Sequence, residues 1–545
     1  MPSTTSARAW LPAVLIAVLA AALYAVNLGR LPHPDELYHL LAADGLLETG
    51  EPAIGTDGRY WRGYLFTWLV AQSIAVFGTS LSAGRLPAVV FMVATVVVLF
   101  LFVRREAGPL AAWVSALLLA TSPFAIDMAQ FIRFYSLQCL LFLAGAWIVY
   151  ELLRAEWRWW PHLPSAVLAL ALLGFAAYLQ PTTLIGLVGL GSWVGVTALV
   201  RLQRSALPTS RKRLLVAGLV GLGLLVLAAA AASGVLADLW QRFRATPLFL
   251  EGRADEFWFY FVVYFVLYPT LLTLSGLLVL LAARKNWRLT LFLLTVFLVS
   301  FVASSLAGAK NTRYMAYAQP FLFALWGVGI ASLVELGRDA IGRLAAELQA
   351  LFGGTAEQTR RRLARGAIGL AVVSIVLANP VWLRSATLLA EVTLPIQTPP
   401  TDWAAAQPAL QPWLETAEIV VTTEELGPLF YYGRADLMLS ATKYPEIPAE
   451  RRAPFAPDHR TDVPTIATVD ELRLAMDCRR NGLFLTQAKH WGPGAERLRD
   501  AAVEELLLSR ARPLDTPRRS RVLAFVWDNA APAANDAACA RVPIR

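Results

Sequence analysis

The chain has 545 residues, of which 57% are hydrophobic and only 16% are charged, and its mean hydropathy is +0.53. A soluble protein of this size carries about a quarter charged residues, so the composition excludes a soluble single-domain enzyme and also an intrinsically disordered chain. The formal net charge is +9, which in a membrane protein more often reports orientation than nucleic-acid binding. We therefore expect a polytopic membrane protein.

Eleven apolar runs are long enough to cross a hydrocarbon core of about 30 Å. They begin near Trp10, Arg85, Pro109, Ser136, Leu163, Thr182, Leu214, Phe257, Leu289, Tyr314 and Ala367. The first run is too long for a signal-peptide core and lacks a small-residue cleavage site, so we interpret it as a retained span. A further stretch, residues 64–78, is shorter and contains Gln72, which favours an interfacial or re-entrant helix.

Basic residues decide the orientation of these spans. If residues 64–78 do not cross, the basic segments 104–105, 154–158, 201–213, 284–288 and 338–365 all lie on the same side as the N-terminus. The positive-inside rule makes that side cytoplasmic and leaves the C-terminus outside. Residues 335–365 are predicted to form an amphipathic helix that lies on anionic lipid headgroups.

The composition changes after Arg384. Prolines at 395, 399 and 400 indicate a linker, so we divide the chain into a membrane module (1–384), a linker (385–400) and an extracytoplasmic domain (401–545). Residues 418–423, 482–486 and 521–527 read as strands, and 469–480 and 494–508 as helices, which predicts a small α/β domain. Cys478 and Cys539 fall in this domain and would pair in an oxidising compartment, whereas Cys139 lies alone in an apolar run.

The first predicted outward segment carries two adjacent carboxylates. It begins His33-Pro34-Asp35-Glu36 directly after the first span. Carboxylates at the membrane edge lose solvation energy unless they have partners or a function. Two interpretations of Asp35 are open at this point: a functional carboxylate, or the N-cap of a helix that begins at Glu36.

Basic side chains occur on three other predicted outward segments. Arg133 is flanked by aromatic residues and is able to pair with a phosphate or with Asp35, although arginines that snorkel at a membrane surface are common. Arg242 is a candidate for holding an anionic headgroup. Lys310 and Arg313 lie outside against the orientation rule. An outward Lys–Arg pair requires an anionic partner, for which a lipid-linked phosphate is the natural candidate.

Three of these motifs, in this order and on this side of the membrane, resemble the C-type (GT-C) glycosyltransferases. They are Pro34-Asp35-Glu36, Arg133-Phe134-Tyr135, and Lys310-Asn311-Thr312-Arg313-Tyr314 followed by Pro320. The most similar subgroup is the protein O-mannosyltransferase and lipid A aminoarabinose transferase superfamily. The resemblance covers residues 11–333, and the segment from 241 to 260 is similar to the large outward loop of that family.

The resemblance implies a GT-C fold of about 11 transmembrane helices with a C-terminal extracytoplasmic α/β domain, in the inner (cytoplasmic) membrane of a bacterium. It also implies transfer of a hexosyl or pentosyl group from a polyprenyl-phosphate donor to a hydroxyl of a lipid, glycan or protein acceptor, on the outer face and with inversion. By this resemblance Asp35 is the general base and Glu36 positions its loop.

The resemblance assigns the donor phosphate to Lys310 and Arg313, assisted by Arg133 or Arg242. These roles are those that the chemistry needs, namely a stronger nucleophile and stabilisation of the leaving phosphate. Further candidates for contact with the substrates are Tyr135, Arg62, His39 and Tyr314. No cofactor is required by this chemistry. Some relatives use a divalent metal ion, for which the candidate ligands here are Asp35 and Asp127.

Two other classes of protein compete with this hypothesis. A transporter or flippase of polyprenyl-linked lipids should show broken spans with charged sites and internal repeats, but here the ionisable residues cluster at the outer ends of the spans and no repeat is visible. A membrane-anchored scaffold leaves the outward pair Lys310 and Arg313 unexplained. The basic excess lies in the predicted cytoplasmic segments, so it gives no support to nucleic-acid binding.

Overall fold

In a computed structural model, the protein is described over residues 4–55, 58–154, 159–245, 256–352, 378–391, 400–441, 443–447, 449–492, 502–529 and 538–542, and at 363, 366–367, 370 and 374. The chain divides into two compact units. The first consists of Met1–Val26, Ala88–Gln130 and Phe134–Ala390, and the second of Asn27–Pro87, Phe131–Arg133 and Glu391–Arg545. The second unit therefore joins segments from both ends of the sequence.

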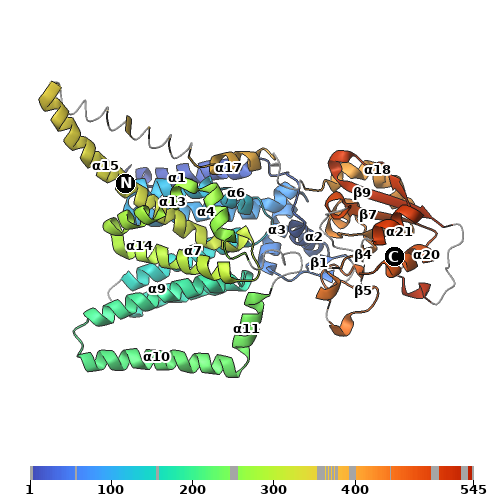
Figure 1. The fold of residues 1–545 in the computed structure, drawn as a ribbon, viewed down its shortest axis with the longest axis horizontal. Coiled ribbons are helices and arrows are strands. Elements are labelled where there is room, and N and C mark those ends of the chain that lie inside the picture. Colours follow the sequence, from blue (N-terminus) through green and yellow to red (C-terminus); the bar gives the residue numbers. More distant parts are fainter. Residues whose placement is uncertain are drawn as a thin grey trace. The chain divides into compact units, whose positions relative to one another are not determined.

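The first unit is helical (Figure 1). Its helices are α1 (Thr4–Ala25), α5 (Pro109–Ala120), α6 (Pro123–Ala129), α7 (Tyr135–Arg154), α8 (Trp159–Leu179), α9 (Thr183–Arg204), α10 (Thr209–Ala232), α11 (Val235–Arg244), α12 (Phe259–Leu267), α13 (Pro269–Thr273), α14 (Ser275–Leu306), the 3-10 helix η2 (Thr312–Ala318), α15 (Gln319–Phe352) and α17 (Val381–Leu389), together with most of α4 (Leu81–Ala107).

Six helices in the described part of the chain are long and apolar enough to cross a membrane, and the bent pair α5–α6 is a seventh candidate, with an angle of 62°. Two shorter apolar helices are Trp10–Ala25 and Tyr64–Phe77. The polytopic helical architecture is thus confirmed, whereas the number of eleven spans stays a prediction. The span predicted near Ala367 lies largely outside the described residues.

Two segments that the sequence predicts to lie between or beyond the spans, 284–288 and 335–365, lie wholly or in part within long helices in the structure. The loop predicted at 284–288 is a break within α14, where Asn286 has non-helical angles of φ −151° and ψ 87°. The Asn286 side chain accepts a hydrogen bond from the backbone N–H of Leu289 (3.1 Å), as an N-cap does where a helix restarts. The amphipathic helix predicted at 335–365 begins as an uninterrupted extension of α15, which runs to Phe352.

Small residues allow close packing of the helices in the first unit. Helix α15 packs against α5 and α14, and α14 also packs against α9. A Cβ atom at Gly327 would lie 2.1 Å from the hydroxyl of Ser115 in α5, and one at Gly329 would lie 2.5 Å from the carbonyl oxygen of Leu278 in α14. Glycines at these positions therefore let the backbones of α15 and its neighbours approach closely.

The second unit contains a seven-stranded sheet in the order β5-β6-β4-β3-β7-β9-β8. Its elements are α2 (Pro34–Thr49), β1 (Ala53–Ile54), β2 (Gly58–Arg59), α3 (Tyr64–Phe77), α18 (Trp403–Thr416), β3 (Ile419–Thr422), α19 (Leu426–Tyr432), β4 (Leu437–Leu439), β5 (Ala456–Pro457), β6 (Pro464–Ile466), α20 (Val469–Cys478), β7 (Asn481–Gln487), α21 (Ala502–Arg510), β8 (Arg512–Leu514) and β9 (Val522–Asp528). Strand β3 is parallel to β4 and β7, and β4 is parallel to β6, while β5, β8 and β9 pair antiparallel. This arrangement confirms the predicted α/β domain.

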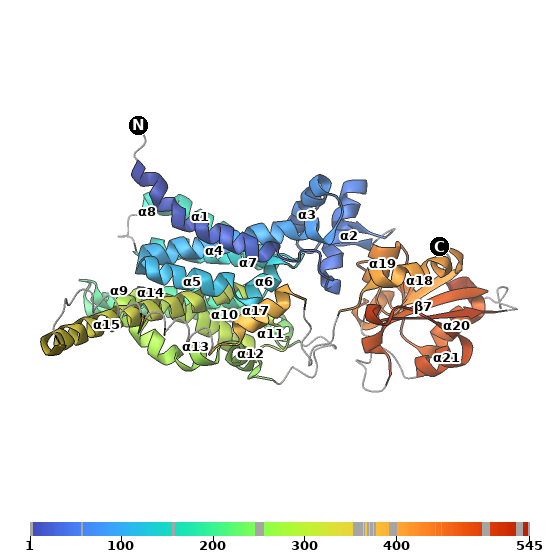
Figure 2. The ribbon, with the colours of Figure 1, turned by 90° about the horizontal axis from the view of Figure 1, so that it is seen from above.

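Alternate residues of the central strands face opposite sides of this sheet. Val420, Leu483 and Leu485 pack against α18, whereas Val421 and Phe484 pack on the side of α20 and α21. This is the period of two that a strand buried on both faces requires. Figure 2 shows α18 on one side of β7 and both α20 and α21 on the other.

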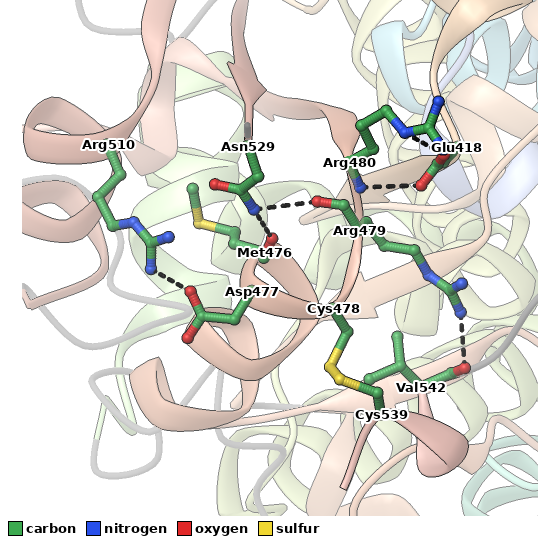
Figure 3. Close-up of a disulfide and its surroundings, with 10 residues drawn as sticks. All are labelled: Glu418, Met476, Asp477, Cys478, Arg479, Arg480, Arg510, Asn529, Cys539 and Val542. Carbon is green, nitrogen blue, oxygen red and sulfur yellow. Dashed lines mark hydrogen bonds and ion pairs between the residues drawn. A yellow bond between two sulfur atoms is a disulfide. The ribbon is translucent and has the colours of Figure 1, made fainter. Parts of the chain in front are cut away.

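A disulfide joins Cys478, the last residue of α20, to Cys539, a pairing that the sequence allows but leaves open (Figure 3). It is reinforced by main-chain contacts from neighbouring side chains. The Arg479 guanidinium donates to the carbonyl oxygen of Val542 (2.8 Å), and the Asn529 amide donates to the carbonyl oxygen of Arg479 (3.0 Å). The bridge thus ties the described C-terminal residues to the sheet.

We predict that replacing both Cys478 and Cys539 by serine destabilises the second unit by about 4 kcal/mol, because the bridge closes a loop of 61 residues and so restricts the unfolded chain. Thermal unfolding in detergent measures the effect. Reductant should lower the midpoint of the wild type to that of the double variant and leave the double variant unchanged. An unaltered wild-type midpoint in reductant contradicts the prediction.

Candidate functional site

The predicted carboxylate motif forms the first turn of α2. The helix begins at Pro34, not at Glu36, and its N-cap is His33, whose Nδ1 accepts a hydrogen bond from the N–H of Asp35 (3.1 Å). The N-cap interpretation of Asp35 is therefore wrong, because the cap lies two residues earlier. The Asp35 side chain is 27% exposed and lies 3.9 Å from the His33 ring, so its carboxylate is accessible from solvent.

Glu36 is buried and forms a bidentate ion pair with Arg85 at the start of α4. Arg85 donates from Nε (2.9 Å) and Nη2 (2.8 Å) to the two carboxylate oxygens. The same carboxylate accepts backbone N–H bonds from His33 (2.9 Å) and Ile132 (3.0 Å). Because four donors occupy it, Glu36 is an anchor for α2 and for the 131–133 turn.

Arg133 connects that turn to the start of α2. Its Nη1 donates to the hydroxyl of Tyr60 (3.0 Å) and to the backbone carbonyl of Asp35 (3.2 Å). The guanidinium is almost fully buried. The sequence suggested either a phosphate or Asp35 as the partner of Arg133. In this structure Arg133 contacts Asp35 through its backbone carbonyl.

His39 lies inside the second unit, one turn beyond Asp35. Its Nδ1 lies 2.8 Å from the hydroxyl of Thr67, and its ring packs edge-on against Tyr60. Burial, followed by the charges of Arg133 and Arg62, holds the pKa of His39 well below its usual value, with Asp35 opposing. His39 is therefore a neutral support of α2, and Arg62 is exposed.

The Lys310 loop belongs to the first unit, between α14 and η2. The Lys310 ammonium is buried and donates to the carbonyl oxygen of Ala307 (2.7 Å). Asn311 caps η2 by accepting from the backbone N–H of Arg313 (3.2 Å). The Arg313 guanidinium carbon lies 5.8 Å from the ring centroids of both Tyr135 and Tyr314. The structure thus brings the predicted Arg313, Tyr135 and Tyr314 together.

Helix α11 reaches the same loop. The Gly308 N–H donates to the carbonyl oxygen of Phe243 (2.9 Å), and Arg244 donates to that of Leu306 (3.3 Å). Phe243 follows Arg242 directly in the sequence, so the backbone next to Arg242 meets the loop that carries Lys310. The side chain of Arg242 lies outside the described parts of the structure.

A groove of ≈ 370 Å³ opens beside η2 in the first unit. Its walls are apolar and consist of Pro123, Phe124, Val262, Val263, Val266, Leu267 and Leu388. Three polar residues also line it, namely Asp127 of α6, Thr312 of η2 and Arg384 of α17. An apolar groove with a few polar groups suits an amphiphilic ligand, and Thr312 lies between Lys310 and Arg313 in the sequence.

The two predicted metal ligands fall in different units, Asp127 in the first and Asp35 in the second. Nowhere in the described ranges do three or more His, Cys, Asp or Glu side chains gather in a way that could hold a metal ion. We therefore derive no chemical step through a metal ion.

Sequence reasoning missed several residues that complete these sites. Arg85 was available as a signal, because an arginine inside an apolar run needs a buried partner. Arg384 marked the end of a span in the sequence but gave no sign that it lines a groove with Asp127. Tyr60 carried no local signal, since its contact with Arg133 joins segments 73 residues apart.

We predict that Glu36→Gln destabilises the protein by about 3–5 kcal/mol, because it leaves the buried guanidinium of Arg85 without a counter-charge. Thermal unfolding in detergent measures the change. The matched control is Glu51→Gln, which breaks the exposed pair with Arg59 and should cost less than about 1 kcal/mol. Equal effects of the two variants would refute a structural role for the buried pair.

We predict an acid-sensitive contribution of His39 to stability. The unfolded chain binds a proton at His39 near pH 6.5, whereas the folded chain does so only at a much lower pH. The free energy of unfolding should therefore fall as the pH drops below about 6.5. His39→Gln should flatten this decline in melting temperature between pH 7 and 5, while His459→Gln, at an exposed histidine, should not. Parallel curves for all three proteins would contradict the prediction.

Comparison with known proteins supports the resemblance seen in the sequence. Residues 62–231 match the family described as dolichyl-phosphate-mannose-protein mannosyltransferase. No curated protein sequence matches the chain. Among solved structures, ArnT from Cupriavidus metallidurans bound to undecaprenyl phosphate aligns with 96% of this chain and 98% of its own, at 15% identity and a TM-score of 0.56.

A second structure extends the comparison to another branch. The archaeal oligosaccharyltransferase AglB from Archaeoglobus fulgidus, in complex with an inhibitory peptide and a dolichol-phosphate, aligns with 88% of this chain and 69% of its own. The identity is 13% and the TM-score 0.54. Identities this low establish the fold. The chain has the fold of the GT-C membrane glycosyltransferases, as its sequence motifs predict.

Proposed function

We propose that the protein is a membrane glycosyltransferase that moves a sugar from a polyprenyl-phosphate donor to an acceptor hydroxyl. The GT-C fold and the family match over residues 62–231 support sugar transfer. The similar ArnT structure holds undecaprenyl phosphate and the AglB structure holds a dolichol-phosphate. The acceptor is a hydroxyl of a lipid, glycan or protein, and the sugar is a hexose or a pentose.

The observation that carries the proposal is the groove beside η2. Its apolar walls suit an isoprenoid chain. One of its lining residues, Thr312, belongs to the same segment of the chain as Lys310 and Arg313. A monophosphate at the end of such a chain needs cationic donors. Lys310 and Arg313 are the donors that we assign to it, with Arg133 and Arg242 as assisting residues.

Asp35 is assigned as the general base. The acceptor oxygen attacks the anomeric carbon, its proton passes to the Asp35 carboxylate, and the bond from the anomeric carbon to the phosphate oxygen breaks. The polyprenyl phosphate leaves with the bonding electron pair, stabilised by Lys310 and Arg313. Direct displacement inverts the anomeric centre. Tyr135, Tyr314 and Arg62 are assigned to contact with the substrates, and the buried His39 to support of α2.

We assign the protein to the inner membrane of a bacterium, with the N-terminus in the cytoplasm. The positions of the basic residues support this orientation. Arg104 and Arg105 lie in the last turn of α4, Arg154 in that of α7, and Arg201 and Arg204 in that of α9. By the positive-inside rule these ends face the cytoplasm. The Cys478–Cys539 disulfide is in keeping with an exported C-terminal domain.

We predict that Asp35→Asn lowers the rate of sugar transfer by about 10²–10⁴-fold, because it removes the base but keeps the shape of the side chain. The measurement incubates the purified protein with radiolabelled polyprenyl-phosphate hexoses and pentoses and with membrane vesicles as the source of acceptor. Asp44→Asn, on the same helix, is the matched control and should retain activity.

Donor binding, measured on the same purified proteins, separates the role of the general base from that of the phosphate-binding residues. Binding of undecaprenyl phosphate should persist in Asp35→Asn but weaken about 10- to 100-fold in Lys310→Met, which loses a charged hydrogen bond. Full transfer by Asp35→Asn would overturn the base assignment. If the wild type transfers no sugar but moves polyprenyl-linked lipids between leaflets, the protein is a transporter or flippase instead.

A further inference from the structure

Helix α2 packs against the C-terminal sheet and its helix α19. Leu37, Tyr38 and Ala42 of α2 share one apolar cluster with residues of α19, of β4 and of the segment before β4. Those partners are Leu426 and Leu429 of α19, Met438 of β4, and Ala435. A helix from the N-terminal part of the chain thus packs into the core of the C-terminal domain.

A charged network surrounds the Tyr38 hydroxyl beside this cluster. Glu425 follows β3 and Lys443 follows β4, and the two form an ion pair. The Tyr38 hydroxyl of α2 donates to Glu425 (3.4 Å) and accepts from Lys443 (3.3 Å) and from Arg460 (3.4 Å). The cationic groups of Lys443 and Arg460 lie 5.8 and 5.6 Å from the centroid of the Tyr38 ring. Tyr38 is therefore held between two cations and one carboxylate.

The centre of the network is buried. Glu425 has no exposed surface and Tyr38 is 4% exposed. Burial opposes the charged form of Lys443, but Glu425 raises the pKa of Lys443 above its usual value. Burial, and then the charge of Glu425, raises the pKa of the neighbouring Glu424 to about 7. The network thus places the Lys443 ammonium against the carboxylate of Glu425.

Backbone contact reinforces this attachment. The β1–β2 ribbon follows α2, and a Cβ atom at Gly58 would lie only 2.5 Å from the carbonyl oxygen of Arg460. A glycine is required there because main chain from the two ends of the sequence meets without room for a side chain. The ribbon and α2 are therefore both fastened to the 458–461 turn.

A continuous path leads from this network to Asp35. The ring of Tyr38 stacks on that of Tyr60, with centroids 5.0 Å apart and planes 13° apart. The Tyr60 hydroxyl accepts from Arg133, which also donates to the backbone carbonyl of Asp35. Each step is a packed ring or a hydrogen bond between buried groups, so a shift of Tyr38 is passed on to the first turn of α2.

We propose that the C-terminal α/β domain is a positioning domain for the catalytic helix: Glu425 and Lys443 fix Tyr38 and, through Tyr60 and Arg133, the place of Asp35. This inference rests on the proposed function for its catalytic consequence, but the positioning itself does not depend on the reaction. Glu425 and Lys443 are positioning residues, and neither takes part in the chemistry.

The test compares Lys443→Met and Glu425→Gln with a matched control in the same domain. The control is Arg434→Met, which breaks a partly buried ion pair with Asp436 (2.8 Å) that does not involve Tyr38, Glu425 or Lys443. Hydrogen exchange of the α2 amides, read by mass spectrometry on the full-length protein, reports positioning. The kcat and KM of sugar transfer report its consequence.

We expect faster exchange of the amides of residues 35–45 in both network variants and a fall in kcat of about 10- to 100-fold at little change in donor KM, as for a displaced catalytic group. Lys443→Arg should restore both values, and Arg434→Met should change neither. Gly58→Ala, which separates the ribbon from Arg460, should reproduce the network variants.

Two outcomes overturn the proposal. Unchanged α2 exchange in folded Lys443→Met and Glu425→Gln refutes the positioning, and faster exchange with an unaltered kcat refutes its importance for catalysis. If the wild type shows no sugar transfer while the exchange of α2 still depends on Lys443, the proposed function fails and the structural attachment stands.

Discussion

Four N–H donors from three separate segments converge on the carboxylate of Glu36. Two come from Arg85, one from His33 and one from Ile132. A buried carboxylate is tolerated only when it is paired and its oxygens are satisfied, so this convergence holds the start of α2, the start of α4 and the 131–133 turn together. Asp35 precedes this anchor by one residue, so a solvent-accessible carboxylate stands on a backbone that its neighbour holds in place.

Local sequence patterns accounted for the elements whose signals are local. The apolar runs predicted the helical unit, and the short apolar segments within 418–423 and 482–486 predicted β3 and β7. Strands β4 and β6 have three residues each, which is too short for a recognisable apolar segment, and they were missed. Single motifs identified Asp35 and Lys310, but the contact of Tyr38 with Glu425 spans 387 positions, and no pattern along the chain encodes it.

The chemistry of the two units is complementary. The first unit offers an apolar groove whose lining includes Thr312. In the sequence, Thr312 lies between Lys310, whose ammonium is buried, and Arg313. The second offers a carboxylate on a helix that is stiffened by ion pairs and stacked aromatic rings. An enzyme that uses a lipid-linked donor needs one surface that suits the membrane and another that suits a polar acceptor, and the composition of each unit follows that division.

The union of residues 27–87 with 391–545 in one unit has a consequence for biogenesis. The ribosome makes α2 early, but the partners of Tyr38 emerge only after all the predicted spans have been synthesised. Contacts of such high sequence separation form late. The helix that bears Asp35 therefore acquires its final packing only when translation is almost complete, so in a truncated chain that has already entered the membrane Tyr38 of α2 still lacks its partners.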